Sequence, residues 1–170
     1  MKFEIFEHQT ALNTVSSSAY YSLSEFNKSF ADNNRDLKLM HLNIRSLYPK
    51  MEEVSCFLEA VGFEFDLICF SETWLNDMLI GLVDLSGYIP YHVTRNDERR
   101  GGGVSVFVKN NYDCTLIDEF CYCNDSMECL FVNVARYDKT FIVGVIYRPP
   151  NCDVSSFLNM LESVLHIVYT

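Results

Sequence analysis

Side chains that could bind a metal or a phosphate lie at the ends of three apolar stretches. Asn43 comes near the end of LKLMHLNI, and Glu72 ends FDLICFSE. Tyr147 and Arg148 end FIVGVIYR, just before two prolines. A lone carboxylate is a credible Mg²⁺ anchor, because this ion takes one or two protein carboxylates and completes its shell with water and substrate phosphate. A phenol beside a guanidinium suits phosphate, so the four residues indicate metal-assisted chemistry on a phosphate.

Each of these residues also has a purely structural interpretation. The amide of Asn43 suits hydrogen bonding to loop backbone. Glu72 suits a solvated acid at a strand end. Tyr147 suits an aromatic at the edge of the core, and Arg148 a charge on the rim. Taken singly, these alternatives stay open, and the meeting of three strand ends is what favours the chemical interpretation.

Seven short runs of apolar, β-branched and aromatic residues are predicted to be strands. They cover residues 37–44, 65–72, 88–95, 103–109, 114–120, 128–136 and 141–148. Several are apolar on both faces, which is typical of strands covered on both sides. In the second run, period-two alternation predicts that Ile68, Phe70 and Glu72 share one face.

Two helices are predicted between and after these strands. The first begins behind Pro49 and ends at Gly62, with Met51, Val54, Leu58 and Val61 at helical spacing. The second is capped by Asp153. Its apolar stripe, expected to pack on a sheet, consists of Phe157, Leu158, Leu161, Val164, Leu165 and Val168.

The predicted architecture is α+β, with stacked sheets covered by helices. Residues 37–170 form the domain, whereas residues 1–36 read as a leader outside it, because polar patches such as TVSSSAYYS interrupt any periodicity. A length of 170 residues and 49% hydrophobic content fit one globular domain. Seven cysteines, an odd number, are expected to stay thiols in a reducing compartment.

The formal net charge of −10 is the wrong sign for a protein that grips phosphates by counterion release. Bulk charge therefore gives no indication of nucleic acid. The N-terminal residues MKFEIFEHQTALN contain no signal-peptide core, and no later stretch is long enough to span a bilayer. An intracellular chain, in nucleus or cytoplasm, is the expectation, with no membrane partner.

Four strings occur in the order seen in one family: HLNIRSL, ICFSETWL, RRGGGVSVFV and FIVGVIYRPPN. From Leu37 to Asn151 the chain resembles the endonuclease domain of non-LTR (LINE or jockey-like) retrotransposons, in the endonuclease/exonuclease/phosphatase superfamily. The resemblance implies a DNase I-like four-layer sandwich of two stacked mixed β-sheets flanked by helices. It also implies cleavage of a DNA phosphodiester with Mg²⁺ or Mn²⁺, beside a reverse transcriptase domain of the same polyprotein.

The resemblance assigns roles to the matching residues. Asn43 looks like the amide near phosphate and metal, Glu72 like the metal-binding carboxylate, and Tyr147 like the phenol that contacts the scissile phosphate. Arg148 is a further candidate for phosphate contact. On the loop before GVSVFV, the arginines expected to touch the DNA backbone are Arg95, Arg99 and Arg100.

Two family motifs, G-D-x-N and S-D-H, are absent before Thr170. In the family they supply the groups that activate water, so the resemblance implies a domain truncated at its C-terminus with no general base. None of His41, His92 and His166 follows an S-D pair, and each is interpreted as structural. The alternatives are a partial endonuclease domain and a catalytically dead fragment or interaction remnant of such an element.

The remaining sequence patterns are weaker indications of function. A phosphatase or sphingomyelinase-like enzyme would share the Asn and Glu positions but not the SETWL and YRPPN strings. The glycines at 101–103 precede a strand, which favours a hairpin over a phosphate-binding loop that leads into a helix. The spacing of the cysteines between 114 and 129 does not form the paired knuckles of a zinc site.

Overall fold

The computed structural model describes residues 3–5, 19–30, 37–95, 101–137 and 139–168. The chain divides into two compact units, which are described separately. One comprises Met1–Asp36 and Cys56–Glu64, and the other comprises Leu37–Ser55 and Phe65–Thr170. Helix α2, Met51–Val61, runs from the second unit into the first. All the candidate residues named above belong to the second unit.

The N-terminal unit contains two strands and a helix that were not predicted from the sequence. Strands β1 (Phe3–Ile5) and β2 (Ala19–Tyr21) pair antiparallel, and helix α1 spans Leu23–Phe30. Ser22 and Glu25 cap α1 reciprocally: the Ser22 amide donates to Glu25 Oε2 at 2.8 Å, and the Glu25 amide donates to Ser22 Oγ at 3.4 Å. This S-x-x-E capping box is the overlooked signal. Whether residues 1–36 act as a leader stays a prediction.

The first large sheet has the strand order β3-β4-β6-β5. The strands are β3 (Leu39–Asn43), β4 (Leu67–Ser71), β6 (Val104–Lys109) and β5 (Tyr88–Val93). Strands β3 and β4 are parallel, and the other pairs are antiparallel. A parallel pair needs a crossover, and α2 lies within it, as the predicted order of strand, helix and strand requires.

The second sheet is antiparallel throughout. It contains β10 (Lys139–Tyr147), β9 (Glu128–Arg136), β7 (Asp113–Leu116) and the short β8 (Tyr122–Cys123). Strands β9 and β10 form a hairpin whose register runs from Lys139 opposite Arg136 to Tyr147 opposite Glu128. The strand predicted over residues 114–120 is shorter than expected, because a 3-10 turn begins at Asp118.

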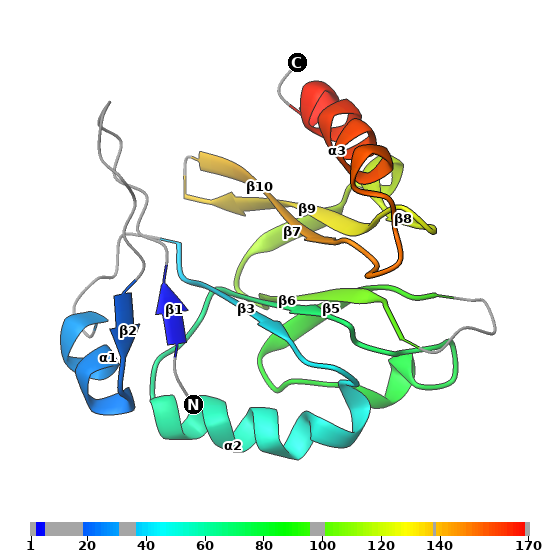
Figure 1. Ribbon diagram of the computed structural model, residues 1–170. Helices are drawn as coiled ribbons and strands as arrows, with labels where there is room; N and C mark the ends of the chain where they lie inside the picture. The colour runs from blue at the N-terminus through cyan, green and yellow to red at the C-terminus, as the bar shows by residue number, and fades with distance from the viewer. Residues whose placement is uncertain (1–2, 6–18, 31–36, 96–100, 138, 169–170) are drawn as a thin grey trace. The chain divides into compact units, whose positions relative to one another are not determined.

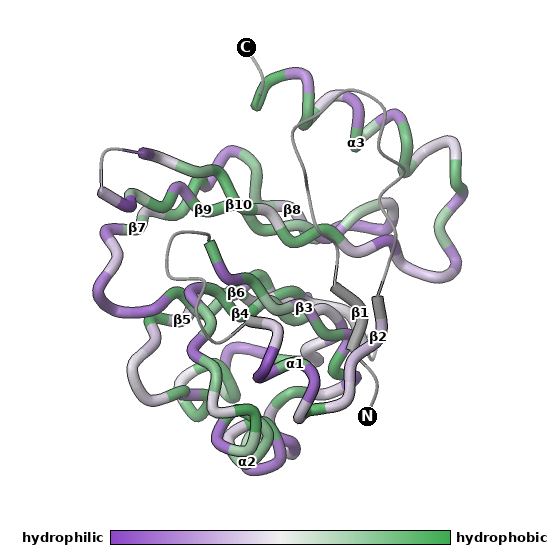
Figure 2. The backbone as a smooth tube through the Cα atoms, turned by 90° about the vertical axis from the view of Figure 1, so that its left-hand side faces the viewer, coloured by the Kyte–Doolittle hydropathy of each residue, from purple (hydrophilic) through white to green (hydrophobic). Residues whose placement is uncertain are grey.

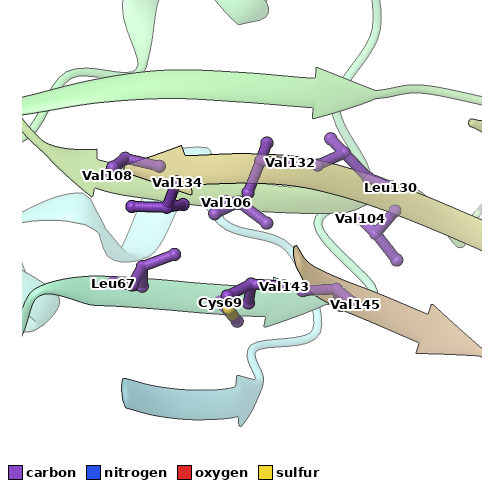
Figure 3. Close-up of a cluster of buried hydrophobic side chains, with 10 residues drawn as sticks. All are labelled: Leu67, Cys69, Val104, Val106, Val108, Leu130, Val132, Val134, Val143 and Val145. Atoms are coloured by element: carbon purple, nitrogen blue, oxygen red, sulfur yellow. The ribbon is translucent and has the colours of Figure 1, made fainter. Parts of the chain in front are cut away.

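The two sheets share one hydrophobic core (Figure 3). Each sheet turns one face of alternate residues toward it, and all five residues of β4 are buried. The strands of both sheets are largely hydrophobic along their length (Figure 2). The cluster consists of Leu67, Cys69, Val104, Val106, Val108, Leu130, Val132, Val134, Val143 and Val145. The predicted fold class, α+β with two stacked sheets and flanking helices, is confirmed.

Helix α3, Val154–Val168, packs on the side of the second sheet away from this core (Figure 1). Asp153 caps it as predicted, since its carboxylate accepts the Ser156 amide at 2.9 Å. The buried stripe is rotated from the predicted one: Met160 contacts the sheet cluster, whereas Leu158 is 53% exposed. Residues that α3 packs against are Phe120, Met127, Cys129 and Phe131.

Helix α2 ends where the sequence predicts. The Gly62 amide donates to the carbonyl of Leu58 at 3.2 Å, and the φ of Gly62 is 60°, in the left-handed region where glycine has no steric penalty. Within the described residues, no helix has the length and apolar character needed to cross a membrane.

Gly144 in β10 lies opposite Phe131 of β9, and a Cβ at this position would come 2.8 Å from Phe131 Cζ. The ring cannot move freely, because it packs edge-to-face on Phe120. We expect Gly144→Ala to lower the free energy of unfolding by about 1–3 kcal/mol, measured by urea denaturation. Gly81→Ala is the matched control, since no atom lies within 4 Å of its added Cβ. Equal midpoints for the two variants would contradict the prediction.

Candidate active site

Three loops meet at one end of the first sheet. They follow β3, follow β4 and precede β6. Backbone hydrogen bonds continue the sheet pairing into these loops: the Ser46 amide donates to the Glu72 carbonyl at 2.8 Å, and the Trp74 amide donates to the Gly102 carbonyl at 2.8 Å. The loop after β4 is therefore held on both sides by its neighbours.

The backbone of these loops is unusual. Arg45, Ser46, Glu72 and Trp74 all have positive φ, at 48°, 79°, 54° and 54°. Non-glycine residues avoid this region because of steric strain, and such residues cluster at functional sites. Four of them in two adjoining loops mark this end of the sheet as the candidate site.

The left-handed backbone at Glu72 redirects its side chain. Strand alternation would place Glu72 on the face of Ile68 and Phe70, away from the second sheet. Instead, the Tyr147 hydroxyl in that sheet donates to Glu72 Oε1 at 2.5 Å. The predicted face of Glu72 was wrong, because the alternation ends where the backbone leaves the extended conformation.

The phenol of Tyr147 has a raised pKa. Burial raises the pKa of its phenol, and so do the hydrogen bond to Glu72 and the charges of Glu72 and Glu128, against a smaller opposing effect of Arg95. The phenol is therefore a neutral hydrogen-bond donor across the physiological range. A donor of this kind can hold a carboxylate or a phosphate oxygen in place.

A groove of about 790 Å³ opens at this junction. Asn43, Glu72 and Tyr147 all line it, so the structure brings together the three residues singled out from the sequence. Their chemical roles stay predictions. The other residues lining the groove are Arg45, Trp74, Arg95, Gly101, Gly102, Asp125, Pro149, Pro150, Asn151 and Cys152.

Among the other residues predicted to contact phosphate or DNA are Arg148, Arg99 and Arg100. Arg148 is exposed and does not line the groove, and its Nη1 donates to the carbonyl of Cys152 at 3.0 Å. Arg99 and Arg100 lie outside the described residues, so their predicted DNA contact stays a prediction.

Sequence reasoning missed a buried ion pair at the groove. Glu128, fully buried at the start of β9, pairs with the guanidinium of Arg95 and accepts the Gly103 amide at 2.5 Å. Arg95 lies in the loop before β6 and lines the groove, but it is only 12% exposed because it pairs with Glu128; its predicted contact with the DNA backbone stays a prediction. The available signal was a glutamate between Met127 and Cys129 in an apolar strand, where a buried acid needs a partner.

The oxygen donors of the groove suit a hard cation. Glu72 offers a carboxylate and Asn43 an amide oxygen, the ligand types that Mg²⁺ takes. Across the parts of the chain that are described, no three or more His, Cys, Asp or Glu side chains gather as a metal cage. The residues present therefore fit an ion that keeps much of its shell as water or substrate oxygen.

The same arrangement of sheets is found in a solved nuclease. The endonuclease domain of TRAS1, a telomere-specific non-LTR retrotransposon, matches with a TM-score of 0.57 and 11% identity over 78% of this chain and 54% of that one. The chain has the endonuclease/exonuclease/phosphatase fold. The resemblance predicted from the sequence motifs is thereby confirmed at the level of the fold.

A second solved structure shares this endonuclease/exonuclease/phosphatase fold. AP endonuclease LMAP from Leishmania major matches with a TM-score of 0.51 and 18% identity, over 72% of this chain and 42% of that one. The chain thus spans about half the length of each solved relative. No family model and no curated protein matches its sequence.

Proposed function

We propose that the chain is the N-terminal portion of a metal-dependent DNA endonuclease domain of a non-LTR retrotransposon. In the complete parent protein this domain nicks target DNA for reverse transcription by a domain of the same polyprotein. The observation that carries the proposal is the contact of Glu72 with Tyr147 at 2.5 Å, between the loop after β4 in the first sheet and the last residue of β10 in the second. Three separate strand ends thereby converge on one polar groove in a fold used by nucleases.

In this proposal each residue has one task. Glu72 would hold Mg²⁺ or Mn²⁺, with the Asn43 amide beside it, and the bound ion neutralises charge on the reacting phosphate. Tyr147, whose raised pKa keeps it protonated, donates to a non-bridging phosphate oxygen once DNA is bound. The arrangement positions a phosphodiester, which is the main requirement of such a reaction.

The charge of the chain supports a metal requirement for DNA binding. The formal net charge is −10, which repels a polyanion at long range. Arg45 and Arg95 line the groove together with Glu72 and Asp125, so its own charges nearly balance. A divalent cation at Glu72 would make the groove net positive where the phosphate enters.

A second candidate function is a catalytically inactive remnant or interaction module of the same element. The groove, within the described residues, is lined by no histidine, so no general base of that type is at hand. Metal binding distinguishes a preserved site from a decayed one.

The test uses the single tryptophan of the chain, Trp74, which lines the groove two residues after Glu72. Mn²⁺ is paramagnetic and quenches a nearby indole. We expect saturable quenching of Trp74 fluorescence by Mn²⁺ in the wild-type chain, and loss of this saturable phase in Glu72→Gln. Competition by Mg²⁺ measures the affinity for the ion expected in the family.

Glu119→Gln is the matched control, since it removes one negative charge from an exposed position that does not line the groove. This variant should keep the wild-type quenching curve. Identical curves for Glu72→Gln and the wild type would overturn the proposed metal site. Circular dichroism of each variant establishes that the fold is retained.

A further inference from the structure

The Arg95–Glu128 ion pair lies at the groove, with Arg95 in its lining and Glu128 fully buried. We propose that this pair is a positioning unit for the candidate metal and phosphate site. It acts on Glu72 through the glycine loop, residues 101–103, and on Tyr147 through the pairing of β9 with β10. Neither side chain is assigned a chemical step, and the inference rests on the proposed function. It explains why an acid and a base are buried where the neighbouring strand residues are apolar.

The first connection runs through the backbone. Glu128 Oε2 accepts the amide of Gly103 at 2.5 Å, and the carbonyl of Gly103 accepts the amide of Thr73 at 3.1 Å. Thr73 lies between the left-handed residues Glu72 and Trp74. Glu128 therefore fixes the loop that holds the Glu72 backbone in its strained conformation.

The second connection runs across the hairpin. Glu128 is the direct partner of Tyr147 in the antiparallel register of β9 and β10. Directly opposed residues have neighbouring side chains, so the carboxylate lies beside the phenol that bonds Glu72. The pair thus acts on both members of the Glu72–Tyr147 contact.

The glycine loop is shaped around the pair. A Cβ at Gly102 would collide with Glu128 Oε1 and would lie 2.7 Å from Arg95 Cζ. A Cβ at Gly103 would lie 2.6 Å from Thr73 Oγ1. Glycines at these positions let the backbone approach both the ion pair and the loop after β4, so the three elements form one tightly packed unit.

Stability alone does not account for a buried pair. The desolvation of two charges commonly offsets their attraction, and well-packed apolar residues of similar volume are often as stabilising. The neighbouring residues along the chain, Met127, Cys129 and Leu130, are apolar and fully buried, so a charged side chain is an exception in this part of β9. A role in holding the groove explains the charges where packing does not.

The experiment measures Mn²⁺ affinity by Trp74 quenching, together with urea unfolding, for the wild type and the double variant Arg95→Leu/Glu128→Leu. We expect the double variant to fold and to lose less stability than removal of Glu128 alone, because neither charge is left without its partner and only the Gly103 amide loses its acceptor. Its Mn²⁺ affinity should fall by about 10- to 100-fold, the effect typical of groups that orient metal ligands. A folded double variant with wild-type affinity would overturn the proposal.

Glu128→Gln provides a second route that preserves side-chain volume. Its amide oxygen can still accept the Gly103 amide, but it does not carry the charge that binds Arg95. The expected result is a smaller loss of Mn²⁺ affinity, by about tenfold. Wild-type affinity in this variant would also count against the positioning role, whether or not the double variant folds.

The buried pair of Arg136 and Asp66, 3.5 Å apart, is the matched control. Arg136 stands at the other end of β9 from Glu128, about 26 Å along the strand. Arg136→Leu/Asp66→Leu should lower stability, since Asp66 also accepts the Lys38 amide and the Tyr112 hydroxyl, while Mn²⁺ affinity is unchanged. An equal loss of affinity in this control would assign the effect to global destabilisation and overturn the inference.

The Glu72→Gln variant distinguishes failure of the positioning role from failure of the proposed metal site. If Glu72→Gln weakens quenching but the Arg95 and Glu128 variants do not, the positioning role fails and the proposed metal site stands. If Glu72→Gln has wild-type quenching, the proposed metal site fails, and the positioning role falls with it.

Discussion

Glu72→Ala is expected to reduce Mg²⁺-dependent nicking of supercoiled plasmid by at least about 100-fold, in the chain joined to the sequence that follows it in its transcript. The reason is that Glu72 is the carboxylate at the junction of both sheets, held by Tyr147 at 2.5 Å. Alanine removes both the candidate metal ligand and the acceptor of the phenol. The measurement is the rate of conversion of supercoiled to open-circular DNA.

Two comparisons make this result interpretable. Glu119→Ala removes an exposed acid outside the groove and should nick at the wild-type rate. Tyr147→Phe keeps Glu72 but removes the phenolic donor, and we expect an intermediate rate. Nicking by Glu72→Ala at the wild-type rate would contradict the assigned role. Absence of nicking by the wild-type extended chain would favour the inactive remnant.

Glu128→Ala is expected to lower the free energy of unfolding by about 3–5 kcal/mol, the largest stability effect predicted for the chain. Glu128 is fully buried and pairs with Arg95, so its removal takes the paired carboxylate from a guanidinium that is only 12% exposed. The Gly103 amide also loses its acceptor. Urea denaturation monitored by circular dichroism gives the change.

A double-mutant cycle tests the origin of this loss. In an Arg95→Leu background, Glu128→Ala should cost clearly less than in the wild type, because no uncompensated guanidinium is left behind. Equal losses in the two backgrounds would show that the effect arises from the cavity and not from the charge. Glu119→Ala, at an exposed position, should change stability by less than about 0.5 kcal/mol.

Local sequence patterns were sufficient for most of the elements in the sandwich. The run at residues 128–136 predicts β9 at its observed bounds, because apolar residues dominate it and Asn133 is the one polar residue between Cys129 and Ala135. Helix α2 was placed by Pro49 and Gly62, whose backbone preferences act within one turn. Asp153 placed the start of α3 for the same reason. Signals of this kind need no knowledge of the rest of the chain.

The arrangement of the site depends on contacts that no local pattern encodes. Glu72 and Tyr147 are 75 positions apart, and Arg95 and Glu128 are 33 apart. Alternation placed Glu72 on the wrong face, because it assumes that the strand conformation persists to the end of the run. The left-handed turn is imposed by the two neighbouring loops. Amides of the loop after β3 donate to the carbonyls of residues 72 and 73, and carbonyls of the loop before β6 accept the amides of residues 73 and 74.

The strained loops have a consequence for how the protein would change under selection. Residues held at positive φ cost of order 1–3 kcal/mol each. Replacing Arg45 or Ser46 with glycine would remove that cost, so we expect a screen for heat resistance to select substitutions at these two positions first. A more flexible backbone there would loosen the groove, so heat-resistant variants should arise readily and bind metal poorly. Such a trade-off would indicate that selection on this chain favoured the geometry of the groove over heat resistance.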